Sequence, residues 1–421
     1  METKFCPARF IYSLVLWLLL PFIFLRLLLR SRRQPEYLQH VGERFGLYSI
    51  KSDKSVIWLH AVSVGETRAT ASLVARLKET CPDHLILLTH ATPTGRVAGE
   101  QLYGDSVMRV YLPYDYPFAV RRFLDHFKPQ LGILMETEIW FNLIHEAAAP
   151  MLLLNARMSE KSARGYERIS CLTRNALQKL SAVAAQTEDD AARLMRLGAQ
   201  NVSVMGNLKF DIVPPQAMLE LGLSLRRQFG EVRQVFLAAS TREGEEELIL
   251  DAWQAQELSA LLVIVPRHPQ RFDQIADMLS GRGLRYQRRS ENRAVSMDVQ
   301  VVLGDSMGEM FAYHAASDLA FIGGSLLPFG GQNLIEACAV GTPVLIGPHT
   351  YNFAVATRLA IDAGAAVQVN NAQQLMQEAK RILNDGDALE VMGKQGVKFV
   401  SSHRGATDKA MRLINEALER G

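Results

Sequence analysis

The sequence has few cysteines and lacks the motifs of several common sites. Its four cysteines are scattered and form no Cys-x-x-Cys pair, which excludes a disulfide framework and a zinc knuckle and fits a reducing compartment. The ten histidines include no His-Glu-x-x-His pair, so a zinc metalloprotease is excluded. Neither Gly-x-Gly-x-x-Gly nor the P-loop motif occurs, so both nucleotide-binding fingerprints are missing.

A strong charge of either sign is also missing. The formal net charge is +2, whereas nucleic-acid-binding domains usually have a marked basic bias, so we expect no nucleic-acid partner. The chain of 421 residues is too long for one ordinary core and predicts two domains of roughly 150–200 residues. Its 48% hydrophobic and 21% charged residues are typical of a globular protein.

One long apolar run, Ile11 to Leu25, precedes an arginine cluster. Four basic residues follow the run, and only two precede it. Those that follow are Arg26, Arg30, Arg32 and Arg33, and those that precede are Lys4 and Arg9. A cleaved signal peptide would end in small residues instead, so we expect membrane association. If the helix spans the membrane, the positive-inside rule keeps the rest of the chain in the cytoplasm. A helix lying in the interface and a buried core helix are the alternatives.

The remainder alternates short β-branched runs with helical patterns, which predicts parallel sheets covered by helices on both sides. The first series of expected strands is 55–62, 84–91, 107–113, 131–136, 151–157, 182–186 and 202–206. The second series is 234–240, 260–267, 299–305, 319–324, 342–348 and 365–369. We therefore expect an α/β protein with two Rossmann-like, doubly wound domains facing a cleft.

Pro214 and Pro215 end the first series. The expected organisation is an anchor at 1–33, an N-terminal domain at 34–212 and a C-terminal domain at 213–421, whose last helix is free to return to the first domain. Ligands of such sheets bind outside the carboxyl ends of the strands, so residues that follow strands are candidates for the site.

Glu66 follows the first strand in the segment Ser63-Val64-Gly65-Glu66. Two interpretations stay open: a helix cap, favoured by the helix dipole, and a catalytic base at the sheet edge. Glu136 and Glu138 follow a later strand, where alternate residues share a face. They can divide acid and base roles, bind partners and hold a loop, or form a solvated strand end.

Basic and hydroxyl residues follow other strands. Lys209 is expected at the domain junction, facing a carboxylate or a phosphate or simply solvent. Ser240 and Arg242 precede an acidic helix start and predict an anion site or a plain capped helix. Arg267 and His268, held between two prolines, suit a phosphate, although a surface turn explains them equally well.

The segment 321–353 is rich in glycine, with pairs at 323–324 and 330–331. Backbone N–H groups near Ser325 and at a helix start formed by Gln332 and Asn333 are expected to bind an anion. Glu336, one turn further, is expected to accept hydrogen bonds from sugar hydroxyls. Ordinary α/β packing is the alternative, but it explains this glycine density less well.

Taken together, these segments resemble the Kdo (3-deoxy-D-manno-octulosonic acid) transferase family of lipopolysaccharide and lipid A biosynthesis. The resemblance covers nearly the whole chain and includes ERFG, HAVSVGE, METEIW, NARMSEKS, GNLKFD, ASTREGEE, PRHPQRF, GDSMGEM, GGSLLPFGGQNLIEA and GPHTYNF. It implies the two-domain GT-B glycosyltransferase fold with an N-terminal membrane-anchor helix. Arg242 stands where the family commonly has histidine, and at Gln332 the family alternates between histidine and glutamine.

The resemblance implies inverting transfer of Kdo from CMP-Kdo to a lipid A precursor, without a metal ion or other cofactor, at the cytoplasmic face of the bacterial inner membrane. Glu66 would be the general base, and the C-terminal domain would hold the nucleotide. Met307, Gly308 and Glu309 would line the nucleotide pocket, and Arg157 would meet the Kdo carboxylate.

Two other functions stay open. A membrane-associated GT-B enzyme that uses a UDP-sugar would have the same architecture. A membrane-anchored binding protein would hold a nucleotide or lipid without turnover, but it needs no base at Glu66. Within the family interpretation, we expect the apolar surface near the anchor, including Trp140 to Leu143, to receive the acyl chains.

Overall fold

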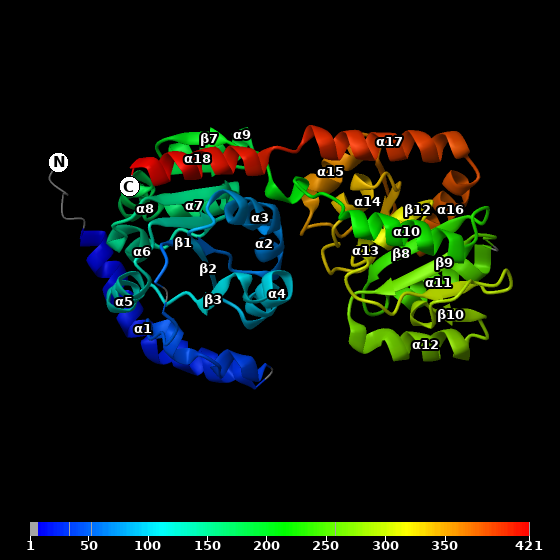
Figure 1. Ribbon diagram of the computed structural model, residues 1–421, viewed down its shortest axis with the longest axis horizontal. Helices are drawn as coiled ribbons and strands as arrows, with labels where there is room; N and C mark the ends of the chain where they lie inside the picture. Colours follow the sequence, from blue (N-terminus) through cyan, green and yellow to red (C-terminus); the bar gives the residue numbers. More distant parts are fainter. Residues whose placement is uncertain (1–6, 33, 52, 257, 421) are drawn as a thin grey trace. The chain divides into compact units, whose positions relative to one another are not determined.

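The computed structural model describes residues 7–32, 34–51, 53–256 and 258–420, so Lys4, Cys6 and Arg33 lie outside the described residues (Figure 1). The chain divides into two compact units: unit 1 is Met1–Asp211 with Arg404–Gly421, and unit 2 is Ile212–His403. The sequence places the boundary after residue 212 and leaves the last helix free to return. In the structure the chain enters unit 2 after Asp211 and returns to unit 1 at Arg404.

Unit 1 is built on a seven-stranded parallel sheet of order β3-β2-β1-β4-β5-β6-β7. Its strands are β1 (Val56–His60), β2 (Leu85–His90), β3 (Met108–Tyr111), β4 (Leu131–Met135), β5 (Met151–Ala156), β6 (Ala182–Ala185) and β7 (Val202–Val204). Its α-helices are α1 (Pro7–Ser31), α2 (Val64–Ala69), α3 (Ala71–Thr80), α4 (Pro93–Tyr103), α5 (Pro117–Phe127), α6 (Phe141–Glu146), α7 (Glu160–Glu167), α8 (Ser170–Lys179), α9 (Glu188–Arg196) and α18 (Ala406–Arg420). Every residue of β1, β4 and β5 is buried, because helices cover both faces of the sheet.

Side chains that alternate along each strand supply two separate cores in unit 1. Trp58 packs in one core with Leu87 and Phe123, and its neighbours Ile57 and Leu59 pack in the other. The described residues of the unit also form the 3₁₀ helices η1 (Pro35–Leu38), η2 (Val41–Phe45), η3 (Gly104–Ser106) and η4 (Leu208–Phe210).

Unit 2 repeats this plan with a parallel sheet of order β10-β11-β9-β8-β12-β13-β14. Its strands are β8 (Val235–Thr241), β9 (Leu261–Pro266), β10 (Tyr286–Arg288), β11 (Val301–Leu303), β12 (Leu319–Ile322), β13 (Val344–Ile346) and β14 (Ala366–Gln368). Its α-helices are α10 (Gln216–Phe229), α11 (Glu245–Gln256), α12 (Phe272–Gly281), α13 (Met310–Ala315), α14 (Ile335–Ala339), α15 (Ala354–Asp362), α16 (Ala372–Leu383) and α17 (Gly386–Ser402). Two 3₁₀ helices, η5 (Pro269–Arg271) and η6 (Arg289–Glu291), connect them.

The last helix, α18, completes a core of unit 1. Its residues Met411 and Ile414 pack with Leu73 of α3 beneath the sheet. Asp211, the last residue before the chain enters unit 2, accepts hydrogen bonds from the backbone N–H groups of Gly405 (2.7 Å) and Thr407. The outgoing and returning segments are therefore tied together within unit 1.

Two smaller expectations fail. The sequence predicted no strand at β10, a three-residue strand at the edge of the second sheet. The segment from Trp140 to Leu143, expected to receive acyl chains, is instead mostly internal. Phe141 and Leu143 are buried in the core of unit 1, and the Phe141 ring contacts Tyr12 of α1.

Candidate active site

The predicted carboxylates of unit 1 lie where the strand order of its parallel sheet reverses. The central strand β1 pairs with β2 on one side and with β4 on the other, so the loops after β1 and β4 diverge at this point. In doubly wound sheets such a switch point forms the ligand-binding crevice. Glu66 follows β1, and Glu136 and Glu138 follow β4.

Glu66 belongs to a reciprocal cap at the start of α2. Ser63 Oγ accepts a hydrogen bond from the backbone N–H of Glu66 (3.3 Å) and donates one to Glu66 Oε1 (2.8 Å). Glu66 Oε2 accepts from the backbone N–H of Val62 (2.9 Å). The capping interpretation is therefore correct as far as it goes. It does not use up the carboxylate, because Glu66 is only half-buried and each of its oxygens has one hydrogen bond in this cap.

Opposing influences act on the proton affinity of Glu66. Burial raises its pKa above the usual carboxyl range, and the nearby charge of Glu136 adds to this increase. The hydrogen bonds from Val62 and Ser63 and the positive charge of Lys209 act in the opposite direction. A carboxylate with a raised pKa is a stronger base, which is what proton abstraction from a sugar hydroxyl needs.

Glu138 is the second carboxyl group with a changed proton affinity. Burial, followed by the charge of Glu66, raises its pKa to about 7, although the Trp140 indole N–H donates to Glu138 Oε2 (2.8 Å). His60 Nε2 lies 3.8 Å from the same oxygen. Burial lowers the pKa of His60 to about 3, so the imidazole is neutral and this contact is not an ion pair.

The reason given from the sequence for grouping Glu136 with Glu138 is wrong. Strand β4 ends at Met135, and Glu136 has a left-handed backbone with φ of 56°. The two carboxyl groups therefore lie in a turn and not on one face of a strand. The charge of Glu136 still raises the pKa of Glu138 and that of Glu66.

Lys209 and Arg157 are also part of unit 1. Lys209 lies in η4, and its charge lowers the pKa of Glu66, so its neighbour is a carboxylate. Arg157 follows β5 with an exposed side chain, and its backbone N–H donates to the carbonyl of Glu136 (3.3 Å). The loops after β1, β4, β5 and β7 thus bring Glu66, Glu136, Glu138, Arg157 and Lys209 to one edge of the sheet.

Unit 2 has an equivalent switch point at β8, which pairs with β9 and β12. The loops that follow β9 and β12 each contact the end of β8 through the backbone. Arg267 N–H donates to Thr241 O (2.9 Å), and Gly323 N–H donates to Ala239 O (2.8 Å). A Cβ atom on Gly323 would lie 2.6 Å from Ser240 O, so only glycine permits this approach.

A cationic group forms at this edge of unit 2. The pKa of His268 is lowered by partial burial and by the charges of Arg242, Arg267 and Arg271. The Arg242 guanidinium lies over the Phe329 ring at 4.6 Å, which fixes its position. Ser240 beside it is half-buried with a left-handed φ of 55°. Predicted residues from the carboxyl ends of β8 and β9 are thus brought together, and their charge suits a phosphate.

The glycine-rich loop does not offer the anion site predicted for it. The carboxylate of Glu245 accepts hydrogen bonds from the backbone N–H groups of Gly324 (2.6 Å) and Leu326 (2.9 Å), as well as from Arg242 (2.8 Å). The backbone N–H groups of Gly324 and Leu326 therefore already donate to a carboxylate of the protein itself. Ser325 is fully buried, donating to Ile322 O and accepting from Gly347 N–H (2.8 Å), so its hydroxyl holds the loop in place.

The helix start predicted at Gln332 is also displaced. Helix α14 begins at Ile335 and has only five residues, and Asn333 caps it by accepting from the Ile335 N–H (3.1 Å). The Asn333 amide also donates to Glu336 Oε1 (3.0 Å), and both side chains are half-buried. Gln332 lies beside Gly324, so it borders the cationic group of unit 2.

The segment Met307-Gly308-Glu309 follows β11. Met307 is 57% exposed and Gly308 has a left-handed φ of 82°, so the turn projects from the sheet. Glu309 accepts from Ser306 Oγ (2.6 Å) and forms an ion pair with Arg289 (3.3 Å). Ser306 and Arg289 thus hold the Glu309 carboxylate in one orientation.

Sequence reasoning missed the internal acidic residues of α11. Glu246 is fully buried and forms an ion pair with Arg271 (2.6 Å) while accepting from Thr241 Oγ1 (2.7 Å). Glu245 is equally buried. The signal available was an acidic first turn directly after a buried strand, where a carboxylate can satisfy neighbouring backbone donors.

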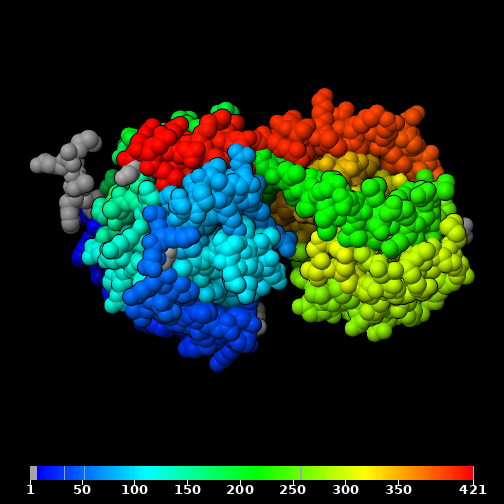
Figure 2. Space-filling view, viewed as in Figure 1, coloured from blue at the N-terminus to red at the C-terminus, as the bar shows by residue number. Residues whose placement is uncertain are grey.

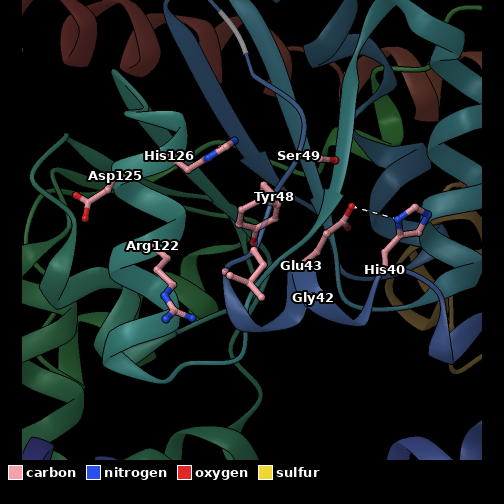
Figure 3. A pocket seen from close by; sticks show the side chains of 10 residues that line it. His40, Gly42, Glu43, Tyr48, Ser49, Arg122, Asp125 and His126 are labelled. Atoms are coloured by element: carbon pink, nitrogen blue, oxygen red, sulfur yellow. Dashed lines mark ion pairs between the residues drawn. The ribbon is translucent and has the colours of Figure 1, made fainter.

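A separate depression of about 750 Å³ lies between η2 and α5 (Figure 3). Its lining includes His40, Glu43 and Arg122 but none of the predicted site residues. Glu43 is held by Arg96 (2.6 Å) and by the backbone N–H of Tyr111 (2.7 Å), so it braces the fold. Among the described residues, no group of three or more His, Cys, Asp or Glu side chains could hold a metal ion.

Comparison with known proteins agrees with the resemblance seen in the sequence. The family model of 3-deoxy-D-manno-octulosonic-acid transferase (kdotransferase) matches residues 39–212, and that of glycosyl transferases group 1 matches residues 254–399. The chain is 41% identical to the 3-deoxy-D-manno-octulosonic acid transferase of Bordetella pertussis, covering 98% of this chain and 100% of the relative. It is 36% identical to the enzyme of the same name from Haemophilus influenzae, covering 98% and 99%.

A solved glycosyltransferase structure from Rickettsia africae has the same fold, with a TM-score of 0.56 at 13% identity over 88% of this chain and 100% of that one. The GT-B fold predicted from the sequence is confirmed. The similarity to the curated transferases extends over almost the entire length of both proteins. The chain belongs to the 3-deoxy-D-manno-octulosonic acid transferase family and is a glycosyltransferase.

Proposed function

We propose that the enzyme transfers Kdo from CMP-Kdo to a sugar hydroxyl of a lipid A precursor, with Glu66 as the general base. The observation that supports this most directly is a half-buried carboxylate with a raised pKa at the switch point of unit 1. Glu66 accepts the proton of the acceptor hydroxyl while the oxygen forms a bond to the anomeric carbon of Kdo. The bond from that carbon to the phosphate oxygen breaks, CMP leaves, and the configuration inverts.

The opposing influences on Glu66 suit this role. Burial and the charge of Glu136 raise the pKa of Glu66 and so strengthen the base, whereas the charge of Lys209 lowers this pKa and favours the ionised form. Glu138, with a pKa of about 7, is partly protonated there and can donate a hydrogen bond to an acceptor hydroxyl. Arg157 supplies an exposed cation for the Kdo carboxylate.

Unit 2 holds the nucleotide in this proposal. Negative charge develops on the phosphate as CMP leaves, and Arg242, Arg267 and His268 are charged or polar donors gathered at the carboxyl ends of β8 and β9. Glu309 and Glu336 are carboxylates that can accept hydrogen bonds from the nucleotide. We place the reaction at the cytoplasmic face of the bacterial inner membrane, where α1 associates the enzyme with its lipid acceptor and raises the local concentration of that acceptor.

The test measures CMP release from CMP-Kdo with and without a lipid A precursor, for the native enzyme and for Glu66→Gln. We expect release that depends on the acceptor and falls at least 100-fold in the variant, since loss of a general base typically costs 10²–10⁴ in rate. Glutamine can still accept from Val62 N–H, so the cap is largely retained. CMP binding by the variant should be unchanged.

Other outcomes are equally informative. Full activity of Glu66→Gln would show that Glu66 is not the general base, but the proposed donor and acceptor would still stand. Turnover of a UDP-sugar without CMP release would show that the donor is a UDP-sugar and not CMP-Kdo. The GT-B fold would be unaffected. An enzyme that releases CMP without any acceptor would show hydrolysis in place of transfer.

A further inference from the structure

Helix α1 has two different faces along its whole length. Its described residues that are not exposed recur every three or four positions, on one stripe: 8, 9, 12, 13, 16, 20, 23, 27 and 31. This spacing is that of one face of an α-helix. Figure 1 shows α1 lying along unit 1, and the helix contacts α6 and α8.

The amino-terminal half of this stripe is held by polar contacts. Arg9 Nη1 forms an ion pair with Glu146 Oε1 of α6 at 2.7 Å. Tyr12 donates a hydrogen bond to Asp115 Oδ2 (3.0 Å), and Asp115 is only 3% exposed. The Tyr116 hydroxyl donates to the backbone carbonyl of Leu16 (2.7 Å). These partners belong to the folded body of unit 1.

Aromatic and aliphatic packing adds further contacts from the middle of α1 towards its carboxyl-terminal end. The Trp17 ring contacts Tyr116 with centroids 5.4 Å apart, and Phe24 stacks on Phe45 of η2 at 5.3 Å. Leu27 is buried, with 5% of its surface exposed. The contacts from Arg9 to Leu27 extend over 18 residues, which is about 27 Å at 1.5 Å per residue.

The opposite face of α1 is apolar and uncovered. We call it the apolar row: Phe10, Ile11, Leu14, Val15, Leu18, Phe22, Leu25, Leu28 and Leu29, each between 45% and 67% exposed. Arg26, Arg30 and Arg32 are exposed at the carboxyl-terminal end of the same helix. In Figure 2, α1 (dark blue) lies on the outside of unit 1.

The helix is long and apolar enough to cross a bilayer, but its contacts argue against crossing. The hydrocarbon core of a bilayer is about 30 Å thick, close to the length over which α1 is attached to unit 1. A helix that spans the membrane in this attached form would bring the surrounding surface of unit 1 to the same depth. That surface includes the ion pair of Arg121 with Glu146 (2.7 Å) and the exposed side chains of Arg122 and Asp125 on α5, which are costly in hydrocarbon.

We propose that α1 lies in the plane of the membrane surface, with the apolar row inserted into one leaflet of a phospholipid bilayer that contains anionic lipid. Arg26, Arg30 and Arg32 supply the charge that is complementary to anionic head groups. This inference rests on the proposed function, which places the acceptor in a membrane. Because α1 is fastened to unit 1 near both ends, unit 1 is held in one orientation against that surface.

The test measures the depth of single nitroxide labels at positions 11, 18 and 25 in the full chain, bound to vesicles of phosphatidylethanolamine and phosphatidylglycerol. The background has the native cysteines replaced by alanine and is first shown to keep transfer activity. Positions 11 and 25 are separated by about 21 Å along the helix. An in-plane helix gives the three labels the same shallow depth, and a label at position 20 on the contact stripe is shielded from lipid.

A spanning helix gives a different profile, with position 18 deepest and positions 11 and 25 near opposite surfaces. That profile, with transfer activity retained, would overturn the in-plane inference and leave the proposed function intact. Absence of vesicle binding, with or without self-association through the apolar row, would overturn the inference and the membrane part of the proposed function together.

A second measurement compares matched variants by vesicle co-sedimentation. Replacing Ile11, Leu18 and Leu25 with serine should weaken vesicle binding at least tenfold. The control, Leu223→Ser, changes an equally exposed apolar residue on α10 of unit 2 (64% exposed) and should leave binding unchanged. Equal binding by both variants would contradict insertion of the apolar row.

Discussion

Glu66 in unit 1 and Glu245 in unit 2 occupy equivalent places with different surroundings. Each lies shortly after the strand at the switch point of its sheet, β1 or β8, in the first turn of the following helix. Glu245 is fully buried and accepts three backbone N–H hydrogen bonds. Glu66 is half-buried, accepts one from the backbone and one from a serine, and lies among other carboxylates.

The difference shows what separates a structural carboxylate from a chemical one at the same place in the fold. Glu245 accepts from three fixed backbone donors, two of them in the loop after β12, so its negative charge stabilises that loop. Glu66 retains a partly accessible carboxylate and is close to charges of both signs, so its proton affinity is adjusted. Sequence position alone does not distinguish the two cases.

The largest effect on stability is expected for Glu245→Ala. Three buried backbone N–H groups lose their acceptor, and the free energy of unfolding of unit 2 should fall by about 3 kcal/mol. The measurement is chemical denaturation, with Glu243→Ala as the control because Glu243 is exposed in the same turn. Equal stability of both variants would mean that water replaces the carboxylate without loss of stability. Glu245 would then not be a structural residue.

The next effect is a pH dependence from Glu138. The fold raises its pKa from 4.5 to about 7, so folding favours the protonated group. Its contribution to stability is present below about pH 4.5 and is lost as pH rises through about 7. Glutamine resembles the protonated form, so Glu138→Gln should gain stability relative to the native enzyme over this range, reaching about 2 kcal/mol by pH 8.

The measurement for this prediction is thermal unfolding at several pH values. The exposed residue Glu188, at the start of α9, offers the matched change Glu188→Gln. We expect the stability difference of the Glu138 variant to increase with pH beyond that of the control. Parallel profiles for both variants would show that Glu138 titrates normally.

The smallest effect on stability is expected for Glu66→Ala. The variant loses the hydrogen bond to Val62 and half of the reciprocal cap, which is worth about 1 kcal/mol. Thermal unfolding measures this loss, and Glu66→Gln provides the control because its amide oxygen can still accept. A loss as large as that of Glu245→Ala would make Glu66 a structural residue and remove the contrast between the two glutamates.

Local sequence patterns predicted the two sheets well, because buried parallel strands are continuous apolar runs bounded by helices. Strand β10 was missed because Tyr286, Gln287 and Arg288 form no such run at the sheet edge. The placing of Glu66 and Glu136 at the carboxyl edge of the sheet followed from their positions directly after predicted strands, whereas Lys209 was predicted only at the domain junction. The placing of the two glutamates did not require knowledge of the contacts.

The role of the glycine-rich loop could not be predicted locally. Its backbone donors at Gly324 and Leu326 are satisfied by Glu245, about 80 residues earlier in the chain. Similarly, the left-handed backbone at Glu136 depends on its hydrogen bonds to the end of β5. Both features come from packing between distant segments, which a pattern of neighbouring residues does not encode.

The return of the chain to unit 1 has a consequence for synthesis on the ribosome. Unit 2 is one continuous segment, whereas unit 1 needs Met411 and Ile414 of α18 to fill the core beneath its sheet. The unit translated first is therefore the unit completed last. A chain that stops before residue 404 would leave the part of that core covered by α18 open to solvent, and such a product would be recognised as unfinished by chaperones and proteases.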